Sequence, residues 1–165
     1  MSGVTEVAVI APVAAVAALL GSAIVAGVFF AFSSFVMGAL ARLPAAEGIA
    51  AMQSINVVVL NRSFLGTFVG TAVVSLVVAG LAVAGWGSPQ APWFLAGALA
   101  YLVGTFLVTG LGNVPLNDRL AAVCAADPEA VPLWEHYLEG WTRLNTLRTV
   151  AAAAAVLLFT AGLRH

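Results

Sequence analysis

Charged residues are scarce in this sequence, and lysine is missing altogether. Of its 165 residues, 8% are charged and 62% are hydrophobic, and the net charge is −1. The mean hydropathy is +1.08. Because a soluble domain carries about 25% charged residues, this composition indicates an integral membrane protein. The lack of a basic cluster also gives no sign of nucleic-acid binding or of a polybasic lipid-binding segment.

Cysteine and histidine are nearly as rare. Cys124 is the one cysteine, which excludes an internal disulfide and a zinc site made of paired cysteines. The two histidines are His136 and His165. Since no metal-ligand set, GxGxxG motif or P-loop stands out, we expect no metal site and no cofactor.

Long uncharged runs divide the chain into four expected membrane spans, because about 20 apolar residues cross a ~30 Å hydrocarbon core. The first run is too long for a signal-peptide core and is expected to be retained. A second long run is interrupted by "GWGSPQAPW", which predicts a hairpin with Trp86 and Trp93 as interfacial anchors. The expected spans cover approximately residues 7–41, 64–84, 93–112 and 146–163.

These spans predict an all-α fold, namely a single transmembrane domain over residues 1–165 that forms an integral membrane four-helix bundle with long helices. A short extra helix is expected on the arginine-rich side, where Pro115 suits a first helical turn and Asp127 an N-cap. Asn113 is expected to cap the end of the third span. The alanine-rich tract "AAAAAV" predicts close helix packing.

The arginines are distributed asymmetrically about these spans. Four spans place both termini on one face, whereas five of the six arginines fall on the other: Arg42, Arg62, Arg119, Arg143 and Arg148. The positive-inside rule makes that second face cytoplasmic. We therefore expect a multi-pass protein of the cell (inner) membrane with its N- and C-termini outside.

Arg148 is the most unusual of these arginines. If Arg164 marks the outer boundary, Arg148 lies about 24 Å away along the helix, short of a full crossing. A charge at that depth usually faces a bundle interior or a wet cavity, which predicts a functional site. The alternative is an arginine that anchors the helix end by reaching outward to the interface.

Other polar and aromatic residues share the helical face of Arg148. At about 100° per residue, Trp134, Tyr137, Trp141 and Asn145 fall with it in an arc of about 80°. His136 falls on nearly the opposite side. An aromatic belt at the membrane interface would explain the Trp and Tyr residues, but it would not require Asn145 and Arg148 on the same face. Two interpretations remain: this face lines a functional pocket, or it forms a structural polar network.

Asparagines cluster at the same expected depth in two further segments. "INVVVLNRSF" contains Asn56 and Asn61, and "GNVPLNDRL" contains Asn113, Asn117 and Asp118. Helix capping explains one such residue but not five. We therefore predict that Asn56, Asn61, Asn113, Asn117, Asn145 and Arg148 converge between helices.

The sequence resembles the four-span membrane proteins of the DUF1772, or anthrone oxygenase-like, family. The resemblance rests on "FVMGALARLP", "INVVVLNRSF", "NVPLNDRL" and the pattern W-x-x-Y-x-x-x-W-x-x-x-N-x-x-R. It implies oxidation of an anthrone at its central ring by O₂ without an evident metal or flavin. In relatives this pattern often reads N-H-x-R, whereas Thr146 follows Asn145 here.

The expected function is thus that of a cofactor-independent, anthrone oxidase-like membrane enzyme acting with O₂ on a planar, polyketide-type aromatic. Arg148, Tyr137 and Asn145 are the expected catalytic residues. The expected substrate-binding residues are Asn56, Asn61, Asn113, Asn117, Trp134 and Trp141. The alternative is a non-catalytic membrane protein that binds or passes a small lipophilic ligand or supports a partner protein. Expected partners are a hydrophobic aromatic molecule, O₂ and membrane lipids, with homo-oligomerisation left open.

Overall fold

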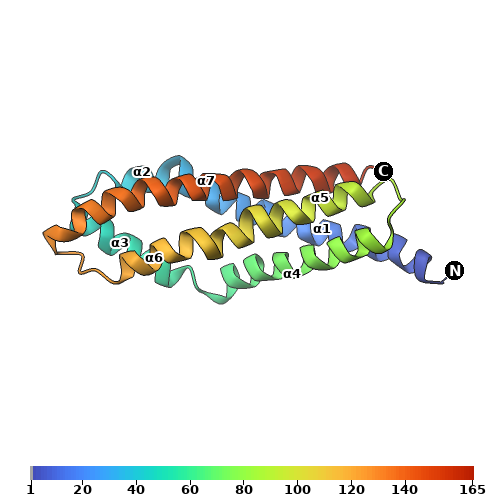
Figure 1. Ribbon diagram of the computed structural model, residues 1–165, viewed down its shortest axis with the longest axis horizontal. Helices are drawn as coiled ribbons and strands as arrows, with labels where there is room; N and C mark the ends of the chain where they lie inside the picture. The colour runs from blue at the N-terminus through green and yellow to red at the C-terminus, as the bar shows by residue number, and fades with distance from the viewer. Residues whose placement is uncertain (1) are drawn as a thin grey trace.

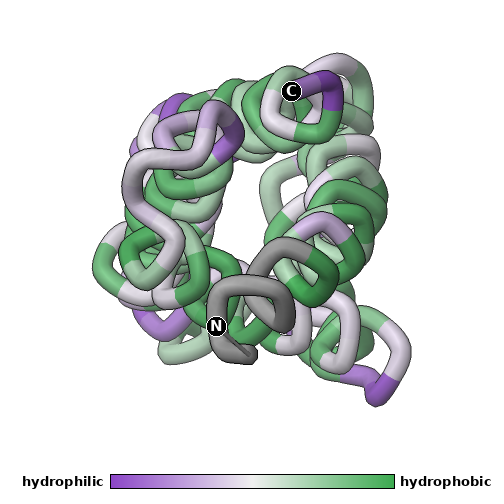
Figure 2. Tube along the Cα trace, turned by 90° about the vertical axis from the view of Figure 1, so that its right-hand side faces the viewer, coloured by the Kyte–Doolittle hydropathy of each residue, from purple (hydrophilic) through white to green (hydrophobic). Residues whose placement is uncertain are grey.

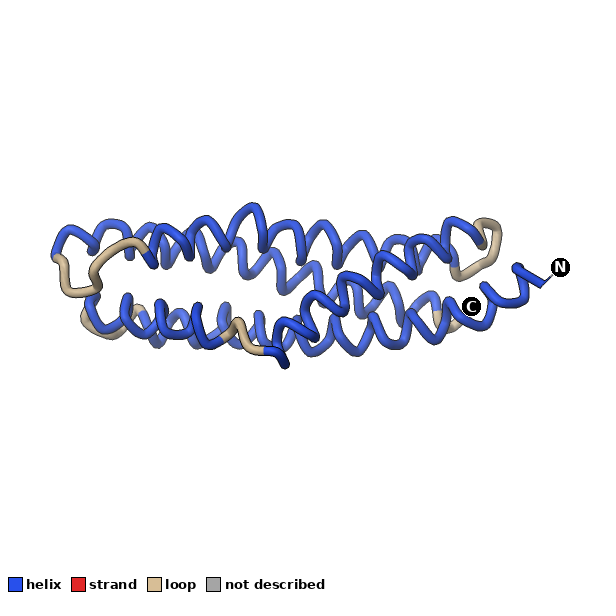
Figure 3. The backbone as a smooth tube through the Cα atoms, turned by 90° about the horizontal axis from the view of Figure 1, so that it is seen from below, coloured by secondary structure: helices blue, strands red, loops and turns tan. Residues whose placement is uncertain are grey.

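The computed structural model describes residues 2–165, with side chains described from residue 9 onward. Long helices lie side by side along one axis and are joined by short loops (Figures 1 and 3). Four of these stretches are long and apolar enough to cross a membrane: Val9–Leu40, Arg62–Ala84, Ala91–Ala121 and Pro128–Gly162. The predicted all-α, four-span fold is therefore confirmed.

Two of the long helices are composites of α-helical and π-helical segments. In chain order the elements are α1 (Ser2–Ala31), the π-helical η1 (Phe32–Val36), α2 (Met37–Leu40), α3 (Ala45–Val58), α4 (Arg62–Ala84), α5 (Ala91–Tyr101), the π-helical η2 (Leu102–Leu107) and η3 (Thr109–Asn113), α6 (Val114–Ala121), the 3₁₀ turn η4 (Pro128–Ala130) and α7 (Val131–Gly162). Single π-helical turns inside α-helices occur frequently at functional sites. Here they lie in the first and third spans.

The two ends of the bundle differ. Both termini and the loop between α4 and α5 lie at one end, which we call the terminal end (Figure 1). The opposite end, which we call the polar end, holds α2, α3, α6 and the beginning of α7. The short helix expected from Pro115 is α6, which continues the third span, and α3 is a further helix at this end that the sequence analysis did not predict.

The outward faces of the spans are apolar. Val13, Leu76 and Leu157 are 68%, 65% and 71% exposed. Figure 2, viewed along the bundle from the terminal end, shows hydrophobic residues all round the helices. Such a surface suits lipid, because helices satisfy their own backbone hydrogen bonds and need no water outside.

Small residues bring the helices close together in the terminal half of the bundle. A Cβ atom added to Gly97 would lie 2.9 Å from ring carbons of Phe159, and one added to Gly104 would lie 2.5 Å from the Cβ of Ala151. Real Cβ atoms essentially never show contacts this short. The glycines of the third span thus let it approach α7 closely, as small residues do in membrane bundles.

Larger side chains form a second core at the polar end. There Met52, Leu120, Trp134, Tyr137 and Trp141 are buried together in one cluster. A separate cluster that includes Phe29, Phe68, Tyr101 and Phe159 fills the rest of the bundle. Arg148 lies where these two cores meet, between Phe29 of one and Trp141 of the other.

The third helix is longer than its predicted span. It was expected to end near residue 112 with Asn113 as its cap, but it continues through η3 into α6 and ends at Ala121. Asn113 makes no cap hydrogen bond there. A proline cannot donate a backbone hydrogen bond. The π-helical turn η3 ends at Asn113, two residues before Pro115, and this irregular turn carries the helix past the proline.

The beginning of the fourth helical stretch follows the expected capping pattern. The Asp127 side chain accepts a hydrogen bond from the Glu129 backbone N–H at 2.9 Å, at the start of η4. The helix α7 then runs without interruption from Val131 to Gly162. Its aromatic first half and its alanine-rich second half therefore form one rigid rod.

Candidate functional site

Arg148 lies in the interior of the bundle, at the junction of the two cores, and is only 3% exposed. Its Nη2 donates to Asn145 Oδ1 at 2.7 Å, and its Nη1 donates to Thr109 Oγ1 at 3.1 Å. Both acceptors are neutral. A buried cation is costly in a membrane unless polar groups surround it, so this position indicates a functional role.

Aromatic rings complete the surroundings of the guanidinium group. Its Cζ lies 4.1 Å from the centroid of the Phe29 ring and 5.3 Å from that of the Trp141 ring. Both distances are within the range of cation–π attraction. The rings thus help to stabilise the charge and hold the guanidinium plane in place.

One donor of Arg148 is left free. The buried Nε has no hydrogen-bond partner among the described residues, and Arg148 lines a cavity of about 530 Å³. Buried donors without partners are rare in folded proteins. Less than 1 Å² of this Nε is exposed, so it is an unsatisfied donor behind the cavity wall, and a ligand could meet Arg148 only through the other atoms of its side chain.

Asn145 fixes the position of Arg148 through the first helix. Its Nδ2 donates to the Phe29 backbone carbonyl and to Ser33 Oγ, each at 2.7 Å. Its Oδ1 accepts from Arg148. Because Asn145 is fully buried and is not in the cavity wall, it acts on the site by holding the guanidinium.

A second network connects the beginning of α7 to α3 and α6. Asn117 Oδ1 accepts from the Tyr137 hydroxyl at 2.8 Å and from Trp141 Nε1 at 2.9 Å. Asn56 Nδ2 donates to the same hydroxyl at 3.4 Å. These contacts satisfy the polar tips of two buried aromatic residues and hold the polar-end helices against the bundle.

Trp134 and Asn113 lie behind the residues that line the cavity. The Trp134 ring stacks on Tyr137 with centroids 5.6 Å apart, and Tyr137 stacks on Trp141 at 6.2 Å. Asn113 Nδ2 donates to the Trp141 carbonyl at 3.2 Å. Both residues support the aromatic face and do not line the cavity.

Asn61 lies outside this cluster. It is exposed and caps α4, since its Oδ1 accepts from the Phe64 backbone N–H at 3.0 Å. Its Nδ2 donates to the Val58 carbonyl at 2.9 Å. Of the six polar residues expected to converge, Asn56, Asn117 and Arg148 line one cavity, and Asn113 and Asn145 lie behind it. The side chain of Asn61 is used by its own helix end.

The cavity beside Arg148 has mostly apolar walls with a few polar groups. Its aromatic lining comes from Phe29, Phe32, Phe64, Phe68, Phe106 and Trp141. Its polar lining comes from Gln53, Asn56, Thr109, Asn117, Asp118 and Arg148. A volume of about 530 Å³ is typical of sites for small organic molecules.

Four of the predicted site residues line this cavity, namely Asn56, Asn117, Trp141 and Arg148. Tyr137, Asn145, Asn113 and Trp134 lie behind it and hold the lining residues. The sequence reasoning missed the contributions of Phe29, Ser33 and Thr109. Ser33 and Thr109 had a signal, because each is a polar residue in a run otherwise expected to face lipid or core.

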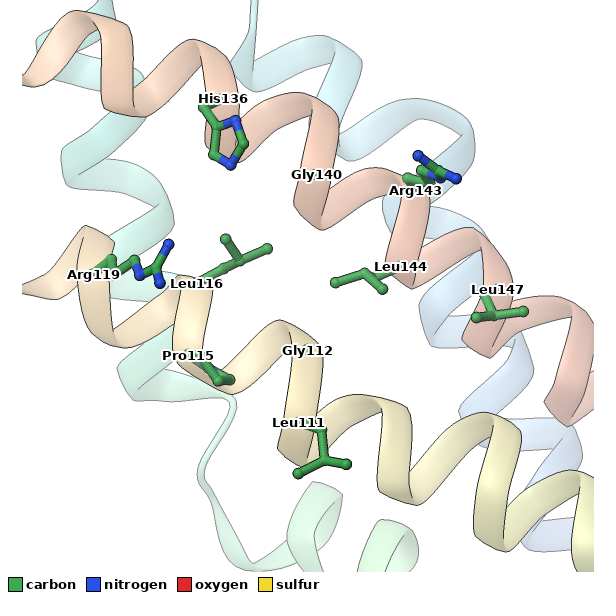
Figure 4. Close-up of a pocket in the computed structure, with 10 residues that line it drawn as sticks. All are labelled: Leu111, Gly112, Pro115, Leu116, Arg119, His136, Gly140, Arg143, Leu144 and Leu147. Carbon is green, nitrogen blue, oxygen red and sulfur yellow. The ribbon is translucent and has the colours of Figure 1, made fainter.

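In the part of the chain with described side chains, no three His, Cys, Asp or Glu residues come together in a way that could hold a metal ion. His136 is exposed and lines a different hollow, between α6 and α7 (Figure 4). Asp118 is the acidic residue among those that line the cavity beside Arg148.

Comparison with known families gives a match to the anthrone oxygenase family over residues 57–158. The matched range begins before α4 and contains most of α7, including Tyr137, Trp141, Asn145 and Arg148. Neither the curated proteins nor the solved structures gave a match. Because the family match covers more than half of the 165 residues, the chain belongs to the anthrone oxygenase family.

Proposed function

We propose that this protein is a cofactor-independent, anthrone oxidase-like membrane enzyme that acts with O₂ on a planar, polyketide-type aromatic. The supporting observation is a buried arginine, Arg148, in the wall of an aromatic-lined cavity. A flat tricyclic ketone matches such a site, since its rings contact the aromatic walls and its oxygen accepts from the guanidinium. Family membership supports the same reaction class.

The reaction needs little from the protein. The central CH₂ of an anthrone is acidic because its carbanion is conjugated with the carbonyl, which then carries oxyanion charge. Loss of a proton gives this anion, addition of O₂ at the same carbon and protonation give a hydroperoxide, and loss of water gives the quinone. One oxygen atom of O₂ ends in the new carbonyl and the other in water.

Arg148 stabilises the oxyanion in this proposal. A fixed donor in a site of low dielectric constant stabilises developing charge far better than water does. Asn145 positions the guanidinium, and Phe29 and Trp141 restrain it and face the ligand. Tyr137 acts through Asn117, whose Oδ1 accepts hydrogen bonds from both Tyr137 and Trp141.

Asp118 is the residue we propose as the proton acceptor. A carboxylate in the same cavity supplies a base where relatives have a histidine next to the asparagine and this chain has Thr146. Asp118 is exposed, so the proton it accepts can pass to solvent at the polar end.

The test is oxygen consumption by the detergent-solubilised protein with an anthrone. Arg148→Lys keeps the charge but loses the planar donor group, and we expect turnover to fall on the order of 10²–10³-fold. Asp118→Asn should also lose most activity, whereas His136→Ala should stay near wild type. Retained activity in Arg148→Lys together with its loss in His136→Ala would overturn the assignment of the site.

The second candidate function is a membrane protein that binds or passes a small lipophilic molecule without transforming it. The replacement of the histidine by Thr146 favours it. The two functions separate in one experiment: a binder retains the aromatic through purification, with Arg148-dependent affinity, yet consumes no O₂ with any anthrone.

We propose that the polar end faces the cytoplasm of a cell (inner) membrane, with both termini outside. The excess of arginine at that end supports this orientation. A reporter that is active only in the cytoplasm should be inactive when fused to the C-terminus and active when inserted after Asp127, in the loop before η4. The reverse result would contradict the orientation.

A further inference from the structure

A second hollow of about 690 Å³ lies at the polar end between α7 and the segment formed by η3 and α6. None of its lining residues lines the cavity beside Arg148. Figure 4 shows Leu116 and Leu144 pointing toward each other across it, with Arg119 and His136 on its facing walls near one end. We call this hollow the α6–α7 groove.

Both walls of the α6–α7 groove change from apolar to basic in the same direction. On α7, Leu147 and Leu144 lie nearer the bundle centre. Toward the polar end, His136 lies about 16 Å along the helix from Leu147 and about 12 Å from Leu144. On the opposite wall Leu111 and Leu116 precede Arg119. The groove thus has an apolar inner part and a basic outer part.

This polarity matches the depth of a lipid leaflet. About 20 helical residues cross a ~30 Å core, so a core that begins at Leu163 ends near Leu144. Leu147 then lies in the hydrocarbon region and Arg143 at its edge. Arg119 points back toward the membrane, because helical side chains tilt toward the N-terminus and α6 runs outward.

The groove is open and carries no negative charge in its walls. Gly140 has no side chain to fill this part of the groove. A Cβ added to it would lie 3.7 Å from Leu116 Cδ1, which is an ordinary contact. The charged or titratable lining residues are Arg119, His136 and Arg143. In Figure 4 the Arg143 side chain points away from the gap, so it lies at the rim.

We propose that the α6–α7 groove binds one anionic phospholipid of the surrounding leaflet. The phosphate lies between Arg119 and His136, with Arg143 at the rim, and an acyl chain follows Leu111, Leu116, Leu144 and Leu147. Arginine donors and an imidazole N–H suit phosphate oxygens. The sequence shows no basic run, and the site exists because the fold brings α6 and α7 together. It is independent of the proposed oxidase function.

The test measures lipid retention by native mass spectrometry of the protein in detergent, titrated with phosphatidylglycerol or phosphatidylcholine. Wild type should prefer phosphatidylglycerol by roughly ten-fold or more. Since an arginine near a membrane surface contributes about five-fold to binding of anionic lipid, Arg119→Gln with His136→Gln should remove most of this preference. Gly140→Leu keeps the charges and fills the groove, so it should lower retention of both lipids.

The matched control is Arg42→Gln with Arg62→Gln, which removes two exposed arginines of the polar end that do not line the groove. This variant should keep the wild-type preference. Equal binding of both lipids by wild type, or an equal loss in the control, would overturn the proposal. Displacement of the lipid by glycerol phosphate at equal concentration would instead make the site one for free phosphate and would also overturn it. The readout needs no anthrone, so its failure is distinct from failure of the proposed reaction.

Discussion

The two halves of α7 are held to their neighbours by different kinds of contact. In the terminal half, Ala151 and Phe159 contact glycines of the third span so closely that a single added methyl group would collide. In the polar half, Tyr137 and Trp141 join the helices through hydrogen bonds of their side chains. Trp134 packs there against Gly48, where an added Cβ would lie 2.9 Å from its ring. One helix therefore combines a tightly packed rod with an open, hydrogen-bonded site.

This difference explains where the cavity lies. Close backbone approach leaves no room for a ligand, whereas large side chains with polar tips hold helices apart and leave gaps between their rings. Arg148 lies at the change from one packing type to the other. The tightly packed half can then fix the helix axis so that the guanidinium stays in position.

The largest expected effect comes from breaking the hydrogen-bonded half at Asn145. Asn145→Leu removes a hydrogen-bond partner from the Phe29 carbonyl, from Ser33 and from Arg148, which should lower the free energy of unfolding by about 3 kcal/mol. Among the described residues, the Ser33 hydroxyl then keeps only Thr146, and the Arg148 guanidinium keeps only Thr109. Unfolding in mixed micelles measures this loss. Thr160→Val, on the exposed face of the same helix, should change the free energy by less than about 0.5 kcal/mol. Equal effects of both changes would show that Asn145 is not a structural centre.

An intermediate effect is expected in the tightly packed half. Gly97→Ala forces a Cβ against the Phe159 ring and should destabilise the protein by about 2 kcal/mol. Gly80→Ala meets nothing within 4 Å and should stabilise α4 by up to about 1 kcal/mol through helix propensity. The same unfolding assay compares them. A stabilising Gly97→Ala would contradict the close packing of the third and fourth spans.

The smallest effect is expected at the asparagine that lies outside the site. Asn61→Ala removes the cap of α4 and should cost about 1 kcal/mol of stability without changing turnover per folded molecule. Asn61→Asp keeps a capping oxygen and should restore the stability. Oxygen consumption normalised to folded protein provides the measurement. A loss of turnover like that of Arg148→Lys would place Asn61 in the site after all.

Hydropathy and helical periodicity were sufficient to predict the four spans and the shared face of Tyr137, Trp141, Asn145 and Arg148. Both patterns depend only on neighbours along one helix. The end of the third helix was predicted wrongly, because a proline next to asparagines resembles a helix boundary when a π-helical turn is not considered. No hydropathy pattern reveals such a turn.

The partners of Arg148 could not be predicted, because they come from other helices. Phe29, Ser33 and Thr109 are close to α7 only once the bundle has formed. The contrast between Asn61 and Asn145 has the same origin. One asparagine bonds to its own helix end and the other to a distant helix, and only the packing of the bundle distinguishes them.

The mouth of the cavity beside Arg148 has a thermodynamic consequence. Val69 and Phe106 line this cavity and are exposed on the outer surface of the spans, at 42% and 37%, beside Val57 and Leu60, which also line it and are 73% and 63% exposed. A cavity that opens between such residues exchanges its contents with the hydrocarbon phase. Its occupancy then follows the mole fraction of ligand dissolved in lipid, so that diluting the protein with extra lipid or detergent lowers the apparent affinity even when the total ligand concentration is unchanged.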